Sequence, residues 1–224
     1  MTSPAGAPWV EGLSMVCHDL RRPLTVIRGA ATLLMEAHDK LPPGNRAQIL
    51  GLIDQSARTM ADLVDDLALV ARLEAGLLPV TLQAVQVRQL METVVDAVRE
   101  GNPQVRLTLL QPGEITVQAD PEQSVRVVRA LVSAALRRSP EGSAPELSAE
   151  VSGGQVRILV ALPTGVAIEE PAEPLLEPFS SSDGDLGLPL YLARRLAGLM
   201  WGVVAVVTLP GGRSAFSFNL NRRV

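Results

Sequence analysis

The amino-acid sequence predicts an α plus α/β fold, in which a helical hairpin is followed by a mixed sheet covered by helices. Up to about residue 78, apolar residues recur at alternating steps of three and four, as they do along packed helices. Beyond Gly76 the pattern changes to short strand-like segments separated by helical stretches. The chain has 224 residues, 47% of them hydrophobic, which is enough for one large domain or two small ones. We therefore expect a flexible leader at 1–8, a helical hairpin at 9–78 and an α/β domain at 79–224.

Two apolar seams predict the helices of the hairpin. The first seam comprises Val10, Leu13, Cys17, Leu20, Leu24, Ile27, Ala31 and Leu34. The second seam comprises Ile49, Ile53, Ser56, Met60, Leu63, Leu67 and Val70. A Leu-Pro-Pro-Gly-Asn break at 41–45 separates them. Because two helices alone expose too much apolar edge, we expect two hairpins to pair into a four-helix bundle, which predicts a homodimer.

The second half reads as alternating strands and helices. Strands are predicted at 80–87, 105–111, 115–119, 146–151, 156–162, 203–209 and 214–220, and helices at 87–100, 121–138 and 188–200. Asp120 is expected as the N-cap of the second of these helices, with Pro121 at its first position. Gly153 and Gly154 predict a tight hairpin. Together these elements predict one sheet covered by helices.

Composition narrows the function classes. A formal net charge of −4 offers no basic field for nucleic acid, so no nucleic-acid partner is expected. The single cysteine, Cys17, excludes an intramolecular disulfide and is consistent with a cytoplasmic protein. No uninterrupted apolar run reaches the length of a bilayer-spanning helix, so no membrane segment is expected. His38 has no second ligand at helical spacing, and no metal site is predicted.

His18 carries the most reactive side chain in the sequence. It follows Cys17, which the first seam assigns to an inward position, so the imidazole is expected on an exposed flank. Pro23 has no amide hydrogen to give to the Asp19 carbonyl and should bend the helix one turn beyond His18. Asp19 can accept a proton or orient one ring nitrogen, which makes the other a better nucleophile toward phosphorus. The alternative is a solvated surface histidine beside a tolerated proline.

Several motifs resemble those of two-component sensor histidine kinases. Residues 18–27, His-Asp-Leu-Arg-Arg-Pro-Leu-Thr-Val-Ile, closely resemble the H box of that family. Residues 65–76 are similar to the end of its second dimerisation helix, and residues 79–87 to its link into the catalytic domain. Residues 120–122 and 139–142 resemble the edges of its N box, 177–179 its F box, and 186–188 part of its second glycine box. The resemblance extends from about residue 10 to 220.

This resemblance implies a dimeric histidine-phosphotransfer bundle followed by an ATP-binding α/β sandwich of the GHKL type. In working members the sandwich binds ATP with magnesium and gives the γ-phosphate to the H-box histidine, and a response-regulator receiver aspartate then takes it. The resemblance assigns His18 as phosphoacceptor and Asp19 as its acid/base neighbour, flanked by Arg21, Arg22 and Pro23. Arg22 stands where many relatives have a threonine or asparagine that positions water for dephosphorylation. It either pairs with a phosphoryl oxygen or a receiver carboxylate, or makes no specific contact.

The nucleotide motifs depart from the family pattern. Ala130 and Ala134 replace the two N-box asparagines, the second a magnesium ligand in the family, and a methyl group cannot coordinate a hard cation. The first glycine box is reduced to Pro163, Gly165 and Ala167, without its adenine-binding aspartate and last glycine. In the second glycine box, Asp183 and Asp185 replace two glycines ahead of Gly187, and carboxylates repel a polyanion. These losses predict a pseudokinase domain with weak or no ATP binding.

Three functions remain open. In the first, His18 exchanges phosphoryl groups with receiver aspartates, needs no cofactor of its own, and receives its phosphoryl group from a receiver or an upstream histidine kinase. In the second, the chain is an active kinase core that uses ATP and magnesium. In the third it is a noncatalytic dimeric scaffold for a receiver or another kinase, and His18 is incidental. The intact H box beside damaged nucleotide boxes favours the first.

Overall fold

The structure of the chain is a computed structural model. It describes residues 7–36, 41–101, 104–110, 113–168, 172–178 and 187–222. The side chains of residues 7–14 and 43 lie outside that description. The chain divides into two compact units, one containing the first two helices and the other the sheet with its helices. Each unit is described by itself. Most of the expected leader lies outside the described residues, and the first helix begins at Ala7.

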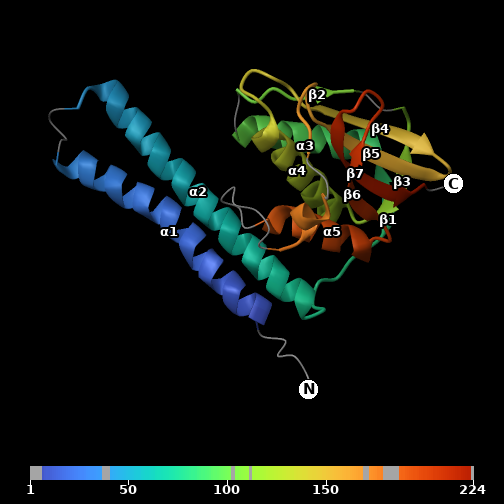
Figure 1. Cartoon of the computed structure of the whole chain (residues 1–224), viewed down its shortest axis with the longest axis horizontal. Helices are drawn as coiled ribbons and strands as arrows, with labels where there is room; N and C mark the ends of the chain where they lie inside the picture. The colour runs from blue at the N-terminus through green and yellow to red at the C-terminus, as the bar shows by residue number, and fades with distance from the viewer. Residues whose placement is uncertain are drawn as a thin grey trace. The chain divides into compact units, whose positions relative to one another are not determined.

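Two long helices, α1 (Ala7–Glu36) and α2 (Pro43–Glu74), form an antiparallel hairpin (Figure 1). The predicted seam of α2 is confirmed: Leu63 and Val70 are buried, and the other five seam residues are partly buried. The helix ends in a Schellman motif, in which Gly76 has φ +67°, its N–H donates to the Leu73 carbonyl, and the Leu77 N–H donates to the Arg72 carbonyl.

The predicted seam of α1 is wrong at two positions, Cys17 and Leu24. Cys17 and Leu24 are exposed, while the residues just before them, Val16 and Pro23, are buried. Leu20, Ile27, Ala31 and Leu34 are partly buried, as expected, and the side chains of Val10 and Leu13 lie outside the description. The sequence contains adjacent apolar residues at 16–17, 23–24 and 30–31, so two seams with the same three-and-four spacing fit it. Packing within the hairpin selects the earlier member of the first two pairs.

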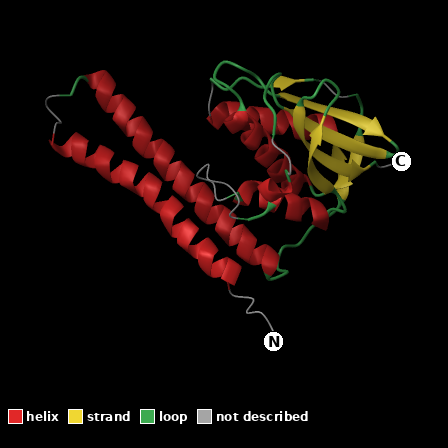
Figure 2. Ribbon diagram, in the orientation of Figure 1, coloured by secondary structure: helices red, strands yellow, loops and turns green. Residues whose placement is uncertain are grey.

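The second unit is a sheet with helices on one side (Figure 2). Its five-stranded sheet has the order β2 (Thr108–Leu109), β4 (Glu146–Ser152), β5 (Gln155–Ala161), β7 (Ser214–Asn221), β6 (Val203–Thr208), with β2 parallel to β4 and the remaining pairs antiparallel. A separate antiparallel pair joins β1 (Gln83–Gln86) to β3 (Thr116–Ala119). The helices are α3 (Val87–Gly101), α4 (Pro121–Arg138), α5 (Leu188–Leu199) and a short 3₁₀ turn, η1 (Glu173–Leu176).

Two local predictions for this unit are confirmed in detail. Helix α4 covers residues 121–138 as predicted, and the Asp120 side chain caps it by accepting a hydrogen bond of 3.0 Å from the Gln123 N–H. Gly153 and Gly154 have φ of +59° and +82°, which the two-residue turn between β4 and β5 requires. The largest fully buried side chains, which form the core, are Phe216, Phe218, Met91, Leu131, Leu147, Ile158, Leu162, Leu188, Leu196, Met200 and Leu220.

Some strands are shorter than predicted. The strand expected at 80–87 is limited to Gln83–Gln86, because the Thr81 N–H donates to the Asp120 side chain and Val87 begins α3. The strand expected at 105–111 pairs only at Thr108 and Leu109, while residues 111 and 112 lie outside the described part of the chain. The helix predicted to end at 200 ends at Leu199 in a second Schellman motif.

Candidate phosphoacceptor site and nucleotide-site positions

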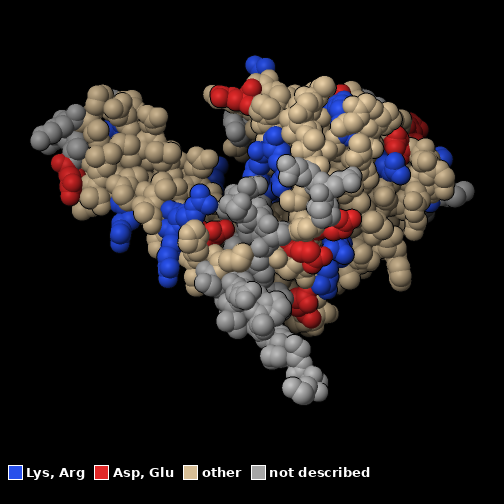
Figure 3. All heavy atoms as spheres, viewed as in Figure 1, with Lys and Arg blue, Asp and Glu red and all other residues tan. Residues whose placement is uncertain are grey.

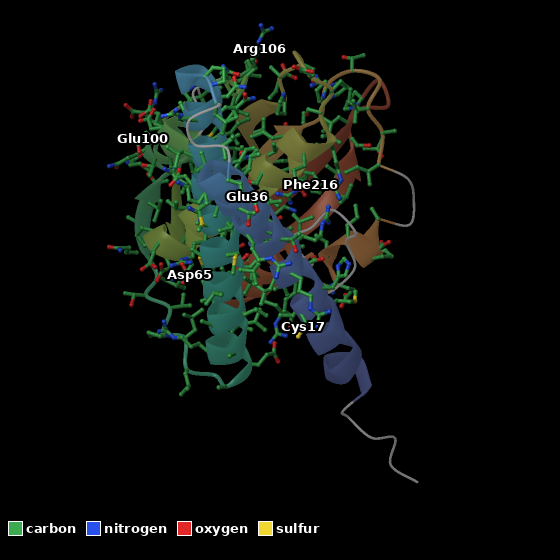
Figure 4. All side chains as sticks on the ribbon, turned by 90° about the vertical axis from the view of Figure 1, so that its left-hand side faces the viewer. Cys17, Glu36, Asp65, Glu100, Arg106 and Phe216 are labelled. Atoms are coloured by element: carbon green, nitrogen blue, oxygen red, sulfur yellow. The ribbon has the colours of Figure 1, made fainter. Side chains whose placement is uncertain are left out.

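His18 lies on α1 with its side chain 71% exposed (Figure 4 labels its neighbour Cys17 on the same helix). Its Nδ1 is 3.1 Å from Oδ1 of Asp19, whose side chain is only 13% exposed. In the tautomer with Nδ1 protonated, the ring donates to the carboxylate and keeps the Nε2 lone pair free. The predicted exposure of His18 is confirmed. The reason given for it was wrong, because Val16 and Pro23 form the buried row of this helix and Cys17 is exposed.

Helix α1 continues through Pro23 without interruption. Proline has no N–H to donate to the Asp19 carbonyl, so the turn that carries His18 lacks one helical hydrogen bond. On the next turn the Thr25 hydroxyl donates to the Arg21 carbonyl at 2.7 Å. Pro23 is buried, and its ring therefore contributes to hairpin packing on the side of α1 away from His18.

Arg22 is exposed one turn after His18, on the same side of α1. Arg21 is also exposed, and blue side chains project from this unit in Figure 3. An anionic group that reaches the His18 ring would therefore meet positive charge on the neighbouring turn. The surface around His18 suits a phosphoryl group or a carboxylate.

The two N-box positions both lie on α4. Ala130 is partly buried and Ala134 is fully buried. Beyond them the Arg138 guanidinium donates to the Ala134 carbonyl at 3.2 Å and lies 5.7 Å from the centre of the Phe216 ring, which Figure 4 labels. The side chains at 130 and 134 are methyl groups, so neither offers an oxygen to a magnesium ion.

The glycine-box positions retain part of the loop geometry. Gly165 has φ +85° in a turn in which the Val166 N–H donates to the Pro163 carbonyl at 3.1 Å, and Ala167 is exposed. Gly187, just before α5, is buried and has φ +65°. Asp183 and Asp185 of the second glycine box lie outside the described residues, as does His38.

Two polar contacts in the second unit were not expected from the sequence. Glu177 forms an ion pair with Arg194 of α5. Asp120, expected only as a helix cap, also accepts a 2.8 Å hydrogen bond from the Thr81 N–H through its second oxygen. Thr81 and Asp120 are 39 residues apart, so no local pattern could have revealed this contact.

Among the described residues, no group of three or more histidine, cysteine or acidic side chains could hold a metal ion. Among the helices described, none is long and apolar enough to cross a membrane.

Comparisons with known proteins agree over both units. Residues 11–76 match the His Kinase A (phospho-acceptor) domain family. The histidine protein kinase DivJ of Caulobacter vibrioides is 29% identical over 219 residues, which cover 93% of this chain and 36% of DivJ. The sensor protein CreC of Escherichia coli is 33% identical over 213 residues, which cover 92% of this chain and 44% of CreC. The chain thus spans less than half the length of these curated relatives.

Solved structures extend the agreement to the fold. The histidine kinase AdeS of Acinetobacter baumannii superposes with a TM-score of 0.71 at 19% identity, over 92% of this chain and 98% of that one. Full-length ShkA, solved in complex with AMPPNP, gives a TM-score of 0.65 at 26% identity over 96% of this chain and 46% of that one. The catalytic domain of the histidine kinase ThkA covers 63% of this chain with a TM-score of 0.53.

The phosphoacceptor match covers the α1–α2 hairpin, and the ThkA catalytic domain has the fold of the sheet unit. Residues 11–76 therefore form a phosphoacceptor domain of the HisKA family within a chain that is similar over nearly its whole length to sensor histidine kinases, and the sheet unit has the GHKL fold of their catalytic domains.

Proposed function

We propose that this chain carries a phosphoryl group on His18 and exchanges it with the aspartate of a response-regulator receiver domain. The observation that carries the proposal is the pairing of an exposed imidazole with a largely buried carboxylate: His18 Nδ1 lies 3.1 Å from Asp19 Oδ1. This contact favours the tautomer whose Nε2 lone pair faces outward. The exposed arginines on the following turn, Arg21 and Arg22, supply positive charge that suits a phosphoryl donor.

The transfer needs few protein groups. The Nε2 lone pair attacks phosphorus, the P–N bond forms, and the P–O bond to the donor breaks with its electron pair leaving on oxygen. Nδ1 keeps its proton, and the positive charge that develops on the ring faces the Asp19 carboxylate. Return transfer reverses these steps: a receiver carboxylate oxygen attacks phosphorus, and the P–N electron pair returns to Nε2.

We further propose that the sheet unit does not supply this phosphoryl group from ATP. Histidine kinases in general use ATP and Mg²⁺, and Mg²⁺ requires oxygen ligands in a near-octahedral arrangement. At the two N-box positions this chain has alanine methyl groups, and Ala134 is fully buried, so no side-chain oxygen is available there. These positions do not fit the metal. The unit would instead serve as a docking surface for the receiver or for another kinase.

The second candidate is an active ATP-dependent kinase core. Gly165 and Gly187 both keep the positive φ that backbone approach to phosphates uses in glycine-rich loops. ShkA, which shares the fold over nearly the whole chain, was solved with the ATP analogue AMPPNP. An active kinase would have to hold the metal through residues other than those at 130 and 134.

A second copy of the chain is the expected partner of the hairpin. Apolar side chains that face away from the hairpin core remain exposed on both helices: Leu24 at 53% and Met35 at 83% on α1, and Leu50 at 56% and Val64 at 52% on α2. Leu24 lies seven residues after Cys17, and Val64 lies fourteen after Leu50, so each pair shares one helix face. We propose that these faces pair in a homodimeric four-helix bundle.

Labelling with [γ-³²P]ATP and Mg²⁺ tests the proposal against the kinase candidate. The full chain, His18→Ala and His38→Ala would be compared; the last is the matched control because the chain has only two histidines. Acid-labile label that is lost in His18→Ala and kept in His38→Ala would establish a kinase and overturn our reading of the sheet unit.

A second experiment distinguishes the phosphoryl relay from the noncatalytic scaffold by using a phosphorylated receiver as the donor to His18. A phosphorylated receiver domain is mixed with each variant, and label on the chain is followed. Transfer that depends on His18 but not on His38 supports the relay. No label from either source, in protein shown to be folded, would leave His18 incidental and favour a noncatalytic scaffold.

A further inference from the structure

Three segments of the sheet unit meet at one buried residue, Asp120, which is 9% exposed. Its Oδ1 accepts from the Gln123 N–H at 3.0 Å and caps α4. Its Oδ2 accepts from the Thr81 N–H at 2.8 Å, in the segment that leads from α2 into β1. Its own N–H donates to the Met200 sulfur at 3.3 Å, just after α5. The carboxylate therefore uses one oxygen for a helix and the other for the connecting segment.

The other end of the connecting segment is also fixed. The Schellman motif of α2 ends with the Leu77 N–H donating to the Arg72 carbonyl at 2.8 Å. The next hydrogen bond of the connection is the one from Thr81 to Asp120. Only Leu78, Pro79 and Val80 lie between the two anchors. The covalent tether between the units is thus three residues long.

Loss of the Thr81–Asp120 hydrogen bond would move the second anchor to Gln83, where β1 begins to pair with β3. Thr81 and Leu82 would then join the free tether. Two extended residues add about 7 Å of reach, at roughly 3.3–3.6 Å per residue. The free tether would thus lengthen from three residues to five.

We propose that Asp120 is a clamp that sets the length of the tether between the His18 hairpin and the sheet unit, through the Oδ2 contact with Thr81. The clamp is supported from two sides. The N-terminal dipole of α4 favours the carboxylate. Met200, 2% exposed, accepts from both the Asp120 N–H and the Ser124 hydroxyl, which fixes the Asp120 backbone to the end of α5. If His18 acts as proposed, this single hydrogen bond would limit how far the sheet unit can move from the hairpin when a receiver or a kinase binds near His18.

The two oxygens of Asp120 allow a selective test, Asp120→Asn in the full chain. Asparagine is as good a helix cap as aspartate, so its carbonyl can still accept from Gln123. Its amide would face the Thr81 N–H as a second donor, and the clamp would open. We expect hydrogen exchange at the Thr81 amide to accelerate roughly tenfold or more, the effect of losing one hydrogen bond to a charged acceptor. Exchange at the Gln123 amide should stay near the wild-type rate.

Thr81→Pro is the complementary variant, since proline removes the donor and leaves the carboxylate and its cap intact. Tether length would be followed in both variants, on a Cys17→Ser background, by the spin-label distance between Gln55→Cys, an exposed position on α2, and Ser152→Cys, an exposed position on β4. Labelled chains would be diluted into excess unlabelled Cys17→Ser protein, so that only distances within one chain are read. Both variants should widen the distance distribution relative to wild type.

Hydrogen exchange and the spin-label distance do not depend on phosphoryl transfer. The clamp can therefore be disproved while the proposed function holds, and the proposed function can be disproved while the clamp holds. Unchanged exchange at Thr81 in Asp120→Asn would show that the contact is not a clamp. Faster exchange with an unchanged distance distribution would show that the contact does not set the tether length. If Asp120→Asn fails to fold, the distance distribution of Thr81→Pro decides the question alone.

Discussion

His18 and Asp19 are adjacent in the chain yet differ sharply in exposure: the imidazole is 71% exposed, the carboxylate 13%, and Nδ1 lies 3.1 Å from Oδ1. A helix normally directs adjacent side chains about 100° apart, so one can face solvent while the next lies against the neighbouring helix. The arrangement places a largely buried hydrogen-bond acceptor beside an exposed imidazole. In the function proposed above, the ring would meet a phosphoryl donor while the Asp19 carboxylate holds its tautomer.

Asp19→Asn should slow phosphoryl transfer to His18 by roughly 10²-fold, the lower end of the contribution of a positioned acid/base group. The amide cannot balance the charge that develops on the ring. The initial rate of label transfer from a phosphorylated receiver domain measures the effect. Arg28→Gln, an exposed substitution on the same helix, serves as the control. Equal rates for Asp19→Asn and wild type would contradict the role given to the carboxylate.

Leu24→Glu should convert the proposed homodimer to monomer. The side chain is 53% exposed in the single hairpin, so a charge there costs the isolated chain little, whereas burial of an unpaired carboxylate in a dimer interface is strongly unfavourable. Molecular mass from light scattering or sedimentation checks this. Leu110→Glu, 48% exposed in the sheet unit, is the matched control and should leave the mass unchanged. A dimer that survives Leu24→Glu would argue against pairing through this face.

Trp201→Gly should stabilise the protein by about 1 kcal/mol, the cost of a left-handed conformation for a residue with a side chain. Trp201 has φ +56° at the end of α5, and its side chain is 78% exposed, so little buried contact is lost. The Schellman contacts around it are made by backbone, with the Gly202 N–H donating to the Ala197 carbonyl at 2.8 Å. Urea denaturation measures the difference. A lower free energy of unfolding would mean that the indole makes stabilising contacts that outweigh the strain.

Gly202→Ala, one residue on, should have the opposite effect. A Cβ at this position would lie 2.7 Å from the backbone oxygen of Asn219 and 3.0 Å from the Phe218 ring. Backbone on a paired strand cannot move away as a side chain can, so we expect a loss of about 1–3 kcal/mol, as for other overpacked sites. The same denaturation experiment tests this. A variant as stable as wild type would require β6 and β7 to separate slightly at this end.

Local chemistry explains which parts of the fold could be predicted. The start and end of α4 follow from Asp120-Pro121 and the Ser139-Pro140 break, and the β4–β5 turn follows from two glycines that tolerate positive φ. The predicted seam of α2 was correct, whereas that of α1 was wrong at Cys17 and Leu24. Both helices contain adjacent apolar pairs, such as Leu63-Val64 on α2 and Val16-Cys17 on α1, so the spacing alone does not select the register on either helix.

Residue identities at fixed spacings were enough to indicate the phosphoacceptor domain, to single out His18 beside Asp19 as the candidate phosphoacceptor, and to find alanine at the positions that resemble the N box. The folded structure was needed to learn which row of α1 is buried, how exposed His18 is, and that the second oxygen of Asp120 holds Thr81. The physical reason is common to all three. Burial and long-range hydrogen bonds depend on which surfaces meet after the chain folds, and residues 39 positions apart carry no local signal of their contact.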